Sequence, residues 1–200
     1  MSSKAELKKQ HIIKTARDLF CRKGYSSITM KDIVEACGIS RGGLYLYFDS
    51  THDIFLEVLR QAEQEDVDFN DDFYDVAANS DYSAAKVIGF FLKAQRREIL
   101  KKEDSLAVAT YEFFFENKLP REENPVRHTY EDLVLLLTQL IERGVEDGEL
   151  YDVDAAAAAR NLMFVIEGMK VTARTMDLDQ RMVDQQLMYI VDTLIPAEQM

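Results

Sequence analysis

Helix-start and helix-stop residues divide the chain into long segments with apolar residues at helical spacing. The first segment, about residues 4–23, carries an apolar stripe and precedes Gly24, which is suited to end a helix in the left-handed conformation. Asn124 with Pro125 and Asp154 have the form of helix N-termini, and Pro196 stops the last segment. The 200 residues include only eight Gly and three Pro, whereas a β protein needs frequent turns. We therefore expect an all-α fold of about nine helices.

The expected helices have approximate limits that follow from these signals. They cover about residues 4–23, 29–37, 41–48, 51–62, 81 or 83 to 99, 105–117, 124–144, 154–176 and 179–194. The fourth leads into an acidic stretch, residues 63–75, which we expect at the surface. No strand pattern and no internal repeat is visible in the sequence.

The formal charge is distributed unevenly along the chain. Residues 1–50 contain nine basic and five acidic residues and carry a net charge of +4, whereas residues 51–200 carry −16. This asymmetry indicates two parts with different partners, of which the basic part suits nucleic acid.

Several classes of protein are not expected. No uninterrupted apolar run exceeds five residues, whereas a membrane-spanning helix needs ~20. The N-terminus has no secretory pattern, so a cytoplasmic protein is expected. Cys21 and Cys37 cannot form a zinc site alone, and neither a metal nor another cofactor is expected. Since there is no phosphate-binding loop or nucleophile elbow, and His11, His52 and His128 are scattered, we do not expect an enzyme.

Residues 29–48 carry the pattern that indicates function. Thr29 and Asp32 have the spacing of an N-cap and N3 pair, the helix they open ends at Gly38, and Ser40 can cap a second, short helix. In a helix-turn-helix, the N-terminal residues of the second helix enter the major groove of DNA. Arg41 can donate two hydrogen bonds to a guanine edge there. The alternative is a structural helical hairpin that does not bind DNA.

The residues that follow Arg41 fit the same interpretation. Gly42 and Gly43 have no side chains and let the helix backbone approach the duplex. Tyr45 and Tyr47 can donate their hydroxyls to phosphate oxygens.

The stretch GISRGGLYLYF, residues 38–48, resembles the signature of tetracycline-repressor-like (TetR) transcriptional regulators. Residues 16–20, 24–25 and 29–33 match the same pattern, and the resemblance covers about residues 8–59. It implies an all-helical homodimer that binds a palindromic operator in double-stranded DNA and a small-molecule effector. The resulting hypothesis is a repressor that the effector releases from DNA. The alternative is an activator, or a regulator that acts through a protein partner.

The resemblance implies a three-helix DNA-binding domain at residues 1–50 and an effector-binding and dimerisation domain at residues 51–200. The residues expected at the DNA are Thr29, Lys31, Ser40, Arg41, Gly42, Gly43, Leu44, Tyr45 and Tyr47. Thr51 departs from the family, which usually has a DNA-backbone-contacting lysine there, and this favours the protein-partner alternative. Leu46 also departs, because the family position is often polar or aromatic.

The acidic part of the chain carries a less specific signal. Residues 162–166 are apolar around the whole helix and residues 179–194 nearly so, which favours a homodimer over one large monomeric core. Aromatic residues on several helices can line a cavity for an apolar or cationic effector, although such residues are also common in plain core. The expected pocket residues are Phe91, Tyr111, Phe114, Phe115, Met163, Phe164 and Glu167, with Glu112 and Glu116 as further carboxylates for a cation.

Overall fold

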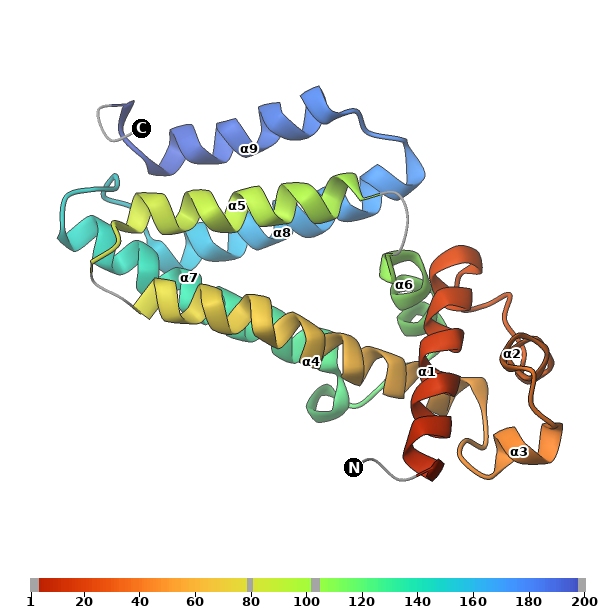
Figure 1. Cartoon of the computed structure of the whole chain (residues 1–200). Coiled ribbons are helices and arrows are strands. Elements are labelled where there is room, and N and C mark those ends of the chain that lie inside the picture. The colour runs from red at the N-terminus through yellow and green to blue at the C-terminus, as the bar shows by residue number, and fades with distance from the viewer. Residues whose placement is uncertain (1–3, 79–80, 102–104, 198–200) are drawn as a thin grey trace. The chain divides into compact units, whose positions relative to one another are not determined.

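The structure is a computed structural model that describes residues 4–78, 81–101 and 105–197, with the backbone alone at residues 63–72, 74, 75 and 78. The described residues are helical and contain no strand, which confirms the expected all-α class (Figure 1). The elements are α1 (Lys4–Lys23), α2 (Met30–Cys37), α3 (Arg41–Tyr45), α4 (Thr51–Ala78), α5 (Ala84–Leu100), α6 (Ala107–Glu116), η1 (Arg121–Glu123), α7 (Pro125–Glu146), α8 (Ala155–Thr175) and α9 (Gln180–Leu194).

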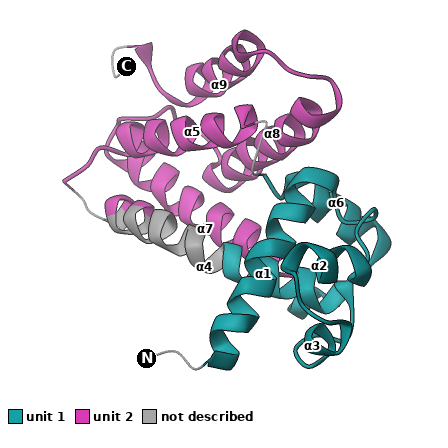
Figure 2. Ribbon diagram, turned by 45° about the vertical axis from the view of Figure 1, so that its right-hand side comes forward, with its two compact units in different colours: residues 1–66, 102–123 teal, residues 67–101, 124–200 magenta. Residues whose placement is uncertain are grey.

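The chain forms two compact units (Figure 2). Unit 1 comprises residues 1–66 and 102–123, and unit 2 comprises residues 67–101 and 124–200. Helix α6 therefore belongs to the unit that contains the N-terminal helices. The sequence favours a second domain at residues 51–200, and that functional boundary remains a prediction.

Unit 1 has an aromatic core to which α1, α4 and α6 contribute. Phe20 and Phe55 meet edge to face, with ring centroids 4.9 Å apart. Phe113 of α6 lies 4.9 Å from Phe55 and 5.0 Å from Tyr25. Helix α2 adds Ile33, which is fully buried in the same core. Burial of these large rings contributes to the stability of unit 1.

Unit 2 is a helical bundle built from α5, α7, α8, α9 and the C-terminal part of α4. Its core is mainly aliphatic, with fully buried residues such as Ile88, Leu137 and Ile166. Arg96 of α5 forms a two-pronged ion pair with Asp184 of α9. These contacts join helices that are far apart in sequence and hold the bundle together.

Helices α3 and α4 differ from the lengths expected. Helix α3 ends at Tyr45 rather than near Phe48, and α4 continues to Ala78 rather than ending near Ala62. The continuation is explained by Phe73 and Ala77, which are buried in unit 2, and the Phe73 ring lies 5.3 Å from that of Phe91. The side chains of the acidic stretch, Phe73 apart, lie outside the described residues, so its expected exposure remains a prediction.

In the described ranges, no helix combines the length and apolar character needed to cross a membrane. The same part of the chain contains no group of three His, Cys, Asp or Glu residues that could hold a metal ion.

Candidate nucleic-acid interface

Helix α2 begins with a complete capping box. The backbone N–H of Thr29 donates to Asp32 Oδ2 at 2.9 Å, and the N–H of Asp32 donates to Thr29 Oγ1 at 3.3 Å. The Thr29 hydroxyl also donates to Asp32, and these bonds lower the pKa of the Asp32 carboxyl. The box satisfies backbone donors that a helix start leaves unpaired and so fixes where α2 begins.

The turn between α2 and α3, residues 38–40, has the geometry of a helix-turn-helix. Gly38 has φ +64°, the left-handed region that favours glycine, and its N–H donates to the carbonyl of Glu35. Ser40 caps α3 by accepting from the N–H of Gly43 at 3.1 Å. Leu44 is fully buried and holds α3 against unit 1. The N-terminal residues of α3 are thereby left at the surface.

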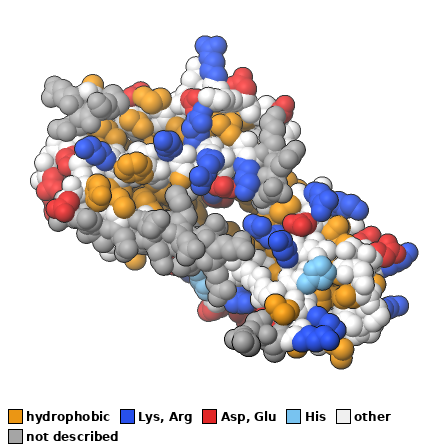
Figure 3. All heavy atoms as spheres, viewed as in Figure 1, with side chains coloured by type: hydrophobic (Ala, Val, Ile, Leu, Met, Phe, Trp, Pro, Cys, Tyr) orange, Lys and Arg blue, Asp and Glu red, His pale blue; other side chains and the backbone are white. Residues whose placement is uncertain are grey.

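Basic side chains meet at this exposed end of α3. Arg41 lies over the Tyr45 ring, with the guanidinium carbon 5.6 Å from the ring centroid. Arg41 also lines a hollow of about 190 Å³ together with Met30, Lys31 and Val34 of α2. The structure thus brings Lys31 and Arg41, ten positions apart in sequence, to one place. Figure 3 shows Lys and Arg side chains on the part of unit 1 that carries α3.

The other expected DNA residues divide into exposed and buried positions. Gly42 is exposed with open space around it, which leaves room for close approach of a duplex. Tyr45 is exposed and Tyr47 half-buried, whereas the hydroxyls of Thr29 and Ser40 are engaged in helix capping. Leu44 differs from the rest, because its side chain lies in the core and is not available to DNA.

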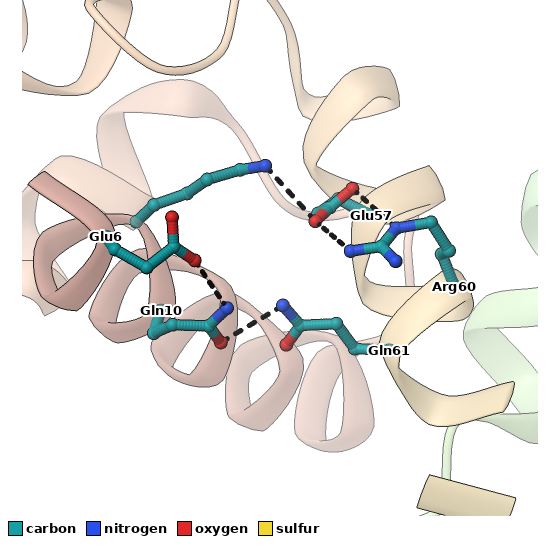
Figure 4. A network of polar contacts seen from close by, with 6 residues as sticks. Glu6, Gln10, Glu57, Arg60 and Gln61 are labelled. Atoms are coloured by element: carbon teal, nitrogen blue, oxygen red, sulfur yellow. Dashed lines mark hydrogen bonds and ion pairs between the residues drawn. The ribbon is translucent and has the colours of Figure 1, made fainter. Parts of the chain in front are cut away.

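A network of polar side chains joins α1 to the first half of α4 within unit 1 (Figure 4). Lys9 Nζ donates to Glu57 Oε1 at 3.2 Å, and Arg60 donates to both oxygens of that carboxylate. The Arg60 guanidinium, followed by Lys9, lowers the pKa of the Glu57 carboxyl. Gln61 Nε2 donates to Gln10 Oε1 at 3.0 Å. These bonds join the first half of α4 to α1, which packs against α2.

Comparison with known proteins decides the family. Residues 12–58 match the family described as bacterial regulatory proteins, tetR family, and residues 87–184 match the tetracyclin repressor-like C-terminal domain. The uncharacterised HTH-type transcriptional regulator YfiR of Bacillus subtilis (strain 168) is 30% identical over 149 residues, or 73% of this chain and 69% of that protein. The chain belongs to the TetR family. Its relatives are transcription regulators, not enzymes, and regulators of the family bind DNA, usually as repressors.

Solved structures agree with the TetR assignment. A TetR transcription regulator from Haloarcula marismortui has a TM-score of 0.76 and 21% identity, over 94% of this chain and 98% of that one. A protein from Saccharomonospora viridis in complex with choline also has a TM-score of 0.76, with 20% identity over 94% and 97% of the two chains. These similarities confirm the fold: an N-terminal helix-turn-helix and a helical C-terminal domain.

The residues expected to line an effector pocket in this TetR-family chain fall on both units. Tyr111, Phe114 and Phe115 lie on α6 in unit 1, and Phe91, Met163, Phe164 and Glu167 lie in unit 2. Phe91 and Met163 are buried in the core, whereas Phe115 and Phe164 are 83% and 67% exposed. Glu167 accepts a hydrogen bond from Lys170 at 2.7 Å. The pocket therefore remains a proposal.

The two carboxylates of α6 contact the turn between α1 and α2, a role that the sequence does not reveal. The sequence suggests Glu112 and Glu116 as partners for a cationic effector. In the structure, Glu112 accepts hydrogen bonds from the backbone N–H groups of Tyr25 and Ser26, and Glu116 accepts one from the Ser26 hydroxyl. No local signal reveals these contacts, because 86 to 90 positions separate the partners.

Proposed function

We propose that this TetR-family regulator is a repressor that binds a palindromic operator as a homodimer and is released by a small-molecule effector. The observation that carries the proposal is the exposed N-terminus of α3, where Arg41 and Lys31 line one hollow. In a helix-turn-helix this end of the second helix faces base edges, and a dimer presents two such ends to two half-sites. The proposed half-site readers are Arg41 for a base and Lys31 for a phosphate.

The direct test is a gel shift with genomic fragments taken from beside the protein's own gene. We expect a retarded complex with one such fragment that excess unrelated DNA does not compete away. Transcription from that fragment with and without the protein then separates a repressor from an activator. Failure of the protein to retard any fragment, combined with capture of a protein partner, would support the alternative that Thr51 suggests.

Replacement of Lys31 by alanine is expected to weaken operator binding with little change in base preference. Lys31 is 83% exposed and its ion pair with Glu35 at 3.7 Å is a weak surface contact, so its ammonium is available to a phosphate. Loss of one phosphate contact lowers the slope of log affinity against log salt by roughly 1. Affinities measured from 50 to 200 mM salt check this, with Lys93→Ala in α5 as the control. An unchanged slope would remove Lys31 from the interface.

A homodimer is supported by the apolar side chains that α8 and α9 leave exposed. Phe164 is 67% exposed and Tyr189 69% exposed, with Met188 beside Tyr189 at 50%. Large apolar side chains that are exposed on the same helix are typical of a surface that another protein covers. We propose that a second copy of the chain covers these side chains.

Tyr189→Glu is expected to convert the dimer to a monomer, because the interface would bury an unpaired carboxylate. Ile190→Glu is a poorer test, because Ile190 is only 5% exposed and its replacement would unfold unit 2. Sedimentation at several protein concentrations measures the result, and Tyr82→Glu, on a tyrosine that is 43% exposed before α5, is the control. A Tyr189→Glu protein that remains dimeric would place the interface elsewhere.

The proposed effector is an apolar or cationic small molecule that binds within residues 84–176. The effector lowers operator affinity only if it binds more tightly to a dimer whose two α3 helices are not spaced to fit both half-sites. A coupling free energy of ~1–3 kcal/mol between effector and operator binding is enough for this. A thermal-shift screen that includes choline, as a representative quaternary ammonium, followed by gel shifts with each hit, tests the proposal. Hits that stabilise the protein yet leave operator affinity unchanged would contradict it.

A further inference from the structure

Two carboxylates from α6 hold the turn between α1 and α2, residues 24–29. The backbone N–H of Tyr25 donates to Glu112 Oε2 at 2.6 Å, and that of Ser26 donates to the same oxygen at 3.0 Å. The Ser26 hydroxyl donates to Glu116 Oε1, one helical turn further along α6. Hydrogen bonds to an ionised carboxylate are stronger than those between neutral groups.

The turn leaves room for the Glu112 carboxylate at Gly24. Gly24 has φ +77°, and a Cβ on this residue would lie 2.5 Å from Glu112 Oε2, so a side chain there would displace the carboxylate. The N–H of Gly24 itself completes α1 by donating to the carbonyl of Phe20 at 2.9 Å. Glycine thus serves both the left-handed end of α1 and the approach of Glu112.

The residue after Glu112 anchors α6 in the same region. Phe113 is fully buried, and its ring meets that of Tyr25 edge to face at 5.0 Å. Tyr25 is therefore held through its backbone by Glu112 and through its ring by Phe113. A displacement of α6 breaks both contacts together.

We propose that Glu112 is a positioning residue for operator binding, which acts by holding the turn from which α2 and α3 are presented. The inference rests on the proposed function, because it concerns the same DNA-reading helix. Helix α2 starts directly after the turn, at the Thr29 cap, and its Ile33 packs in the same core as Leu44 of α3. Loosening the turn therefore frees α2 and α3 to move relative to α1, and fewer molecules present Arg41 correctly.

The test compares Glu112→Ala and Glu112→Gln with wild type, using the full chain and the operator fragment recovered by gel shift. Glutamine keeps an oxygen that can accept both N–H groups, whereas alanine has none. The control is Glu122→Gln, which removes an exposed carboxylate in η1. Operator affinity is measured together with amide hydrogen exchange at Tyr25 and Ser26, and far-UV circular dichroism checks that each variant is folded.

We expect Glu112→Ala to lower operator affinity about tenfold, which corresponds to ~1.4 kcal/mol, and to speed exchange of both amides. Glu112→Gln should stay within about threefold of wild type with both amides protected, and the control should be unchanged. The inference would be overturned if the operator affinity of Glu112→Ala were within about twofold of wild type. It would also be overturned if a folded Glu112→Gln lost as much operator affinity as Glu112→Ala. If the alanine variant does not fold, a tenfold loss of operator affinity in folded Glu112→Gln would also overturn the inference. Absence of DNA binding by wild type would instead contradict the proposed function.

Discussion

Replacement of Arg41 by alanine is expected to cost about 1–3 kcal/mol of operator binding and to abolish the preference for one base pair in each half-site. Arg41 is exposed at the first position of α3, and its guanidinium lies over the Tyr45 ring. A bidentate contact with guanine depends on the planar fork of the guanidinium, so Arg41→Lys should recover charge but not base preference. Affinity for a set of half-sites that differ by one base pair measures both effects.

The control for Arg41 is Arg97→Ala, which removes an exposed guanidinium from α5. This variant does not alter α3, so it tests whether the loss of any positive charge lowers operator affinity as much as Arg41→Ala does. If Arg41→Ala binds every half-site variant with the same proportional loss, Arg41 is a phosphate contact and not a base reader.

Phe113→Ala is expected to destabilise unit 1 by ~3–5 kcal/mol, as is usual for removal of a buried phenylalanine. The Phe113 ring is fully buried and lies within about 5 Å of the rings of Tyr25, His52 and Phe55. Its removal leaves a cavity among groups that are fixed by α1, α4 and the α1–α2 turn. DNA binding should be lost at temperatures where wild type still binds, although Phe113 lies more than sixty positions from Arg41 in sequence.

The matched control for Phe113→Ala is Phe115→Ala, two positions further along α6. Phe115 is 83% exposed, and Phe115→Ala should change stability by no more than ~0.5 kcal/mol. Urea unfolding followed by circular dichroism compares the two variants. Similar losses in both would show that α6 is not packed in unit 1 as described.

Helix boundaries were predictable where a side chain caps the backbone within three residues. Asn124 accepts from the N–H of Arg127 at 3.1 Å, and Asp154 accepts from that of Ala157 at 2.9 Å. Both helices begin where the sequence places them, because the capping bond depends on local spacing alone. The same locality made the helix-turn-helix readable from residues 29–48.

Features that depend on distant contacts were not predictable in the same way. The acidic composition after Ala62 favours a surface segment and gives no indication that α4 continues. The continuation depends on the burial of Phe73 and Ala77 in unit 2, which neighbouring residues in the sequence do not indicate. The run of three phenylalanines in α6 gave no indication of which ring is buried. Glu112 was indistinguishable from a surface carboxylate, because its partners lie in the turn between α1 and α2.

Selection of binding sites from a randomised DNA pool, performed with wild type and with Arg41→Ala, tests the central claim most directly. We predict that wild type enriches a two-fold symmetric sequence and that Arg41→Ala enriches the same sequence except for one base pair in each half-site. Enrichment of no sequence by wild type, or of identical base preferences by the two proteins, would contradict the assignment of α3 as the DNA-reading helix.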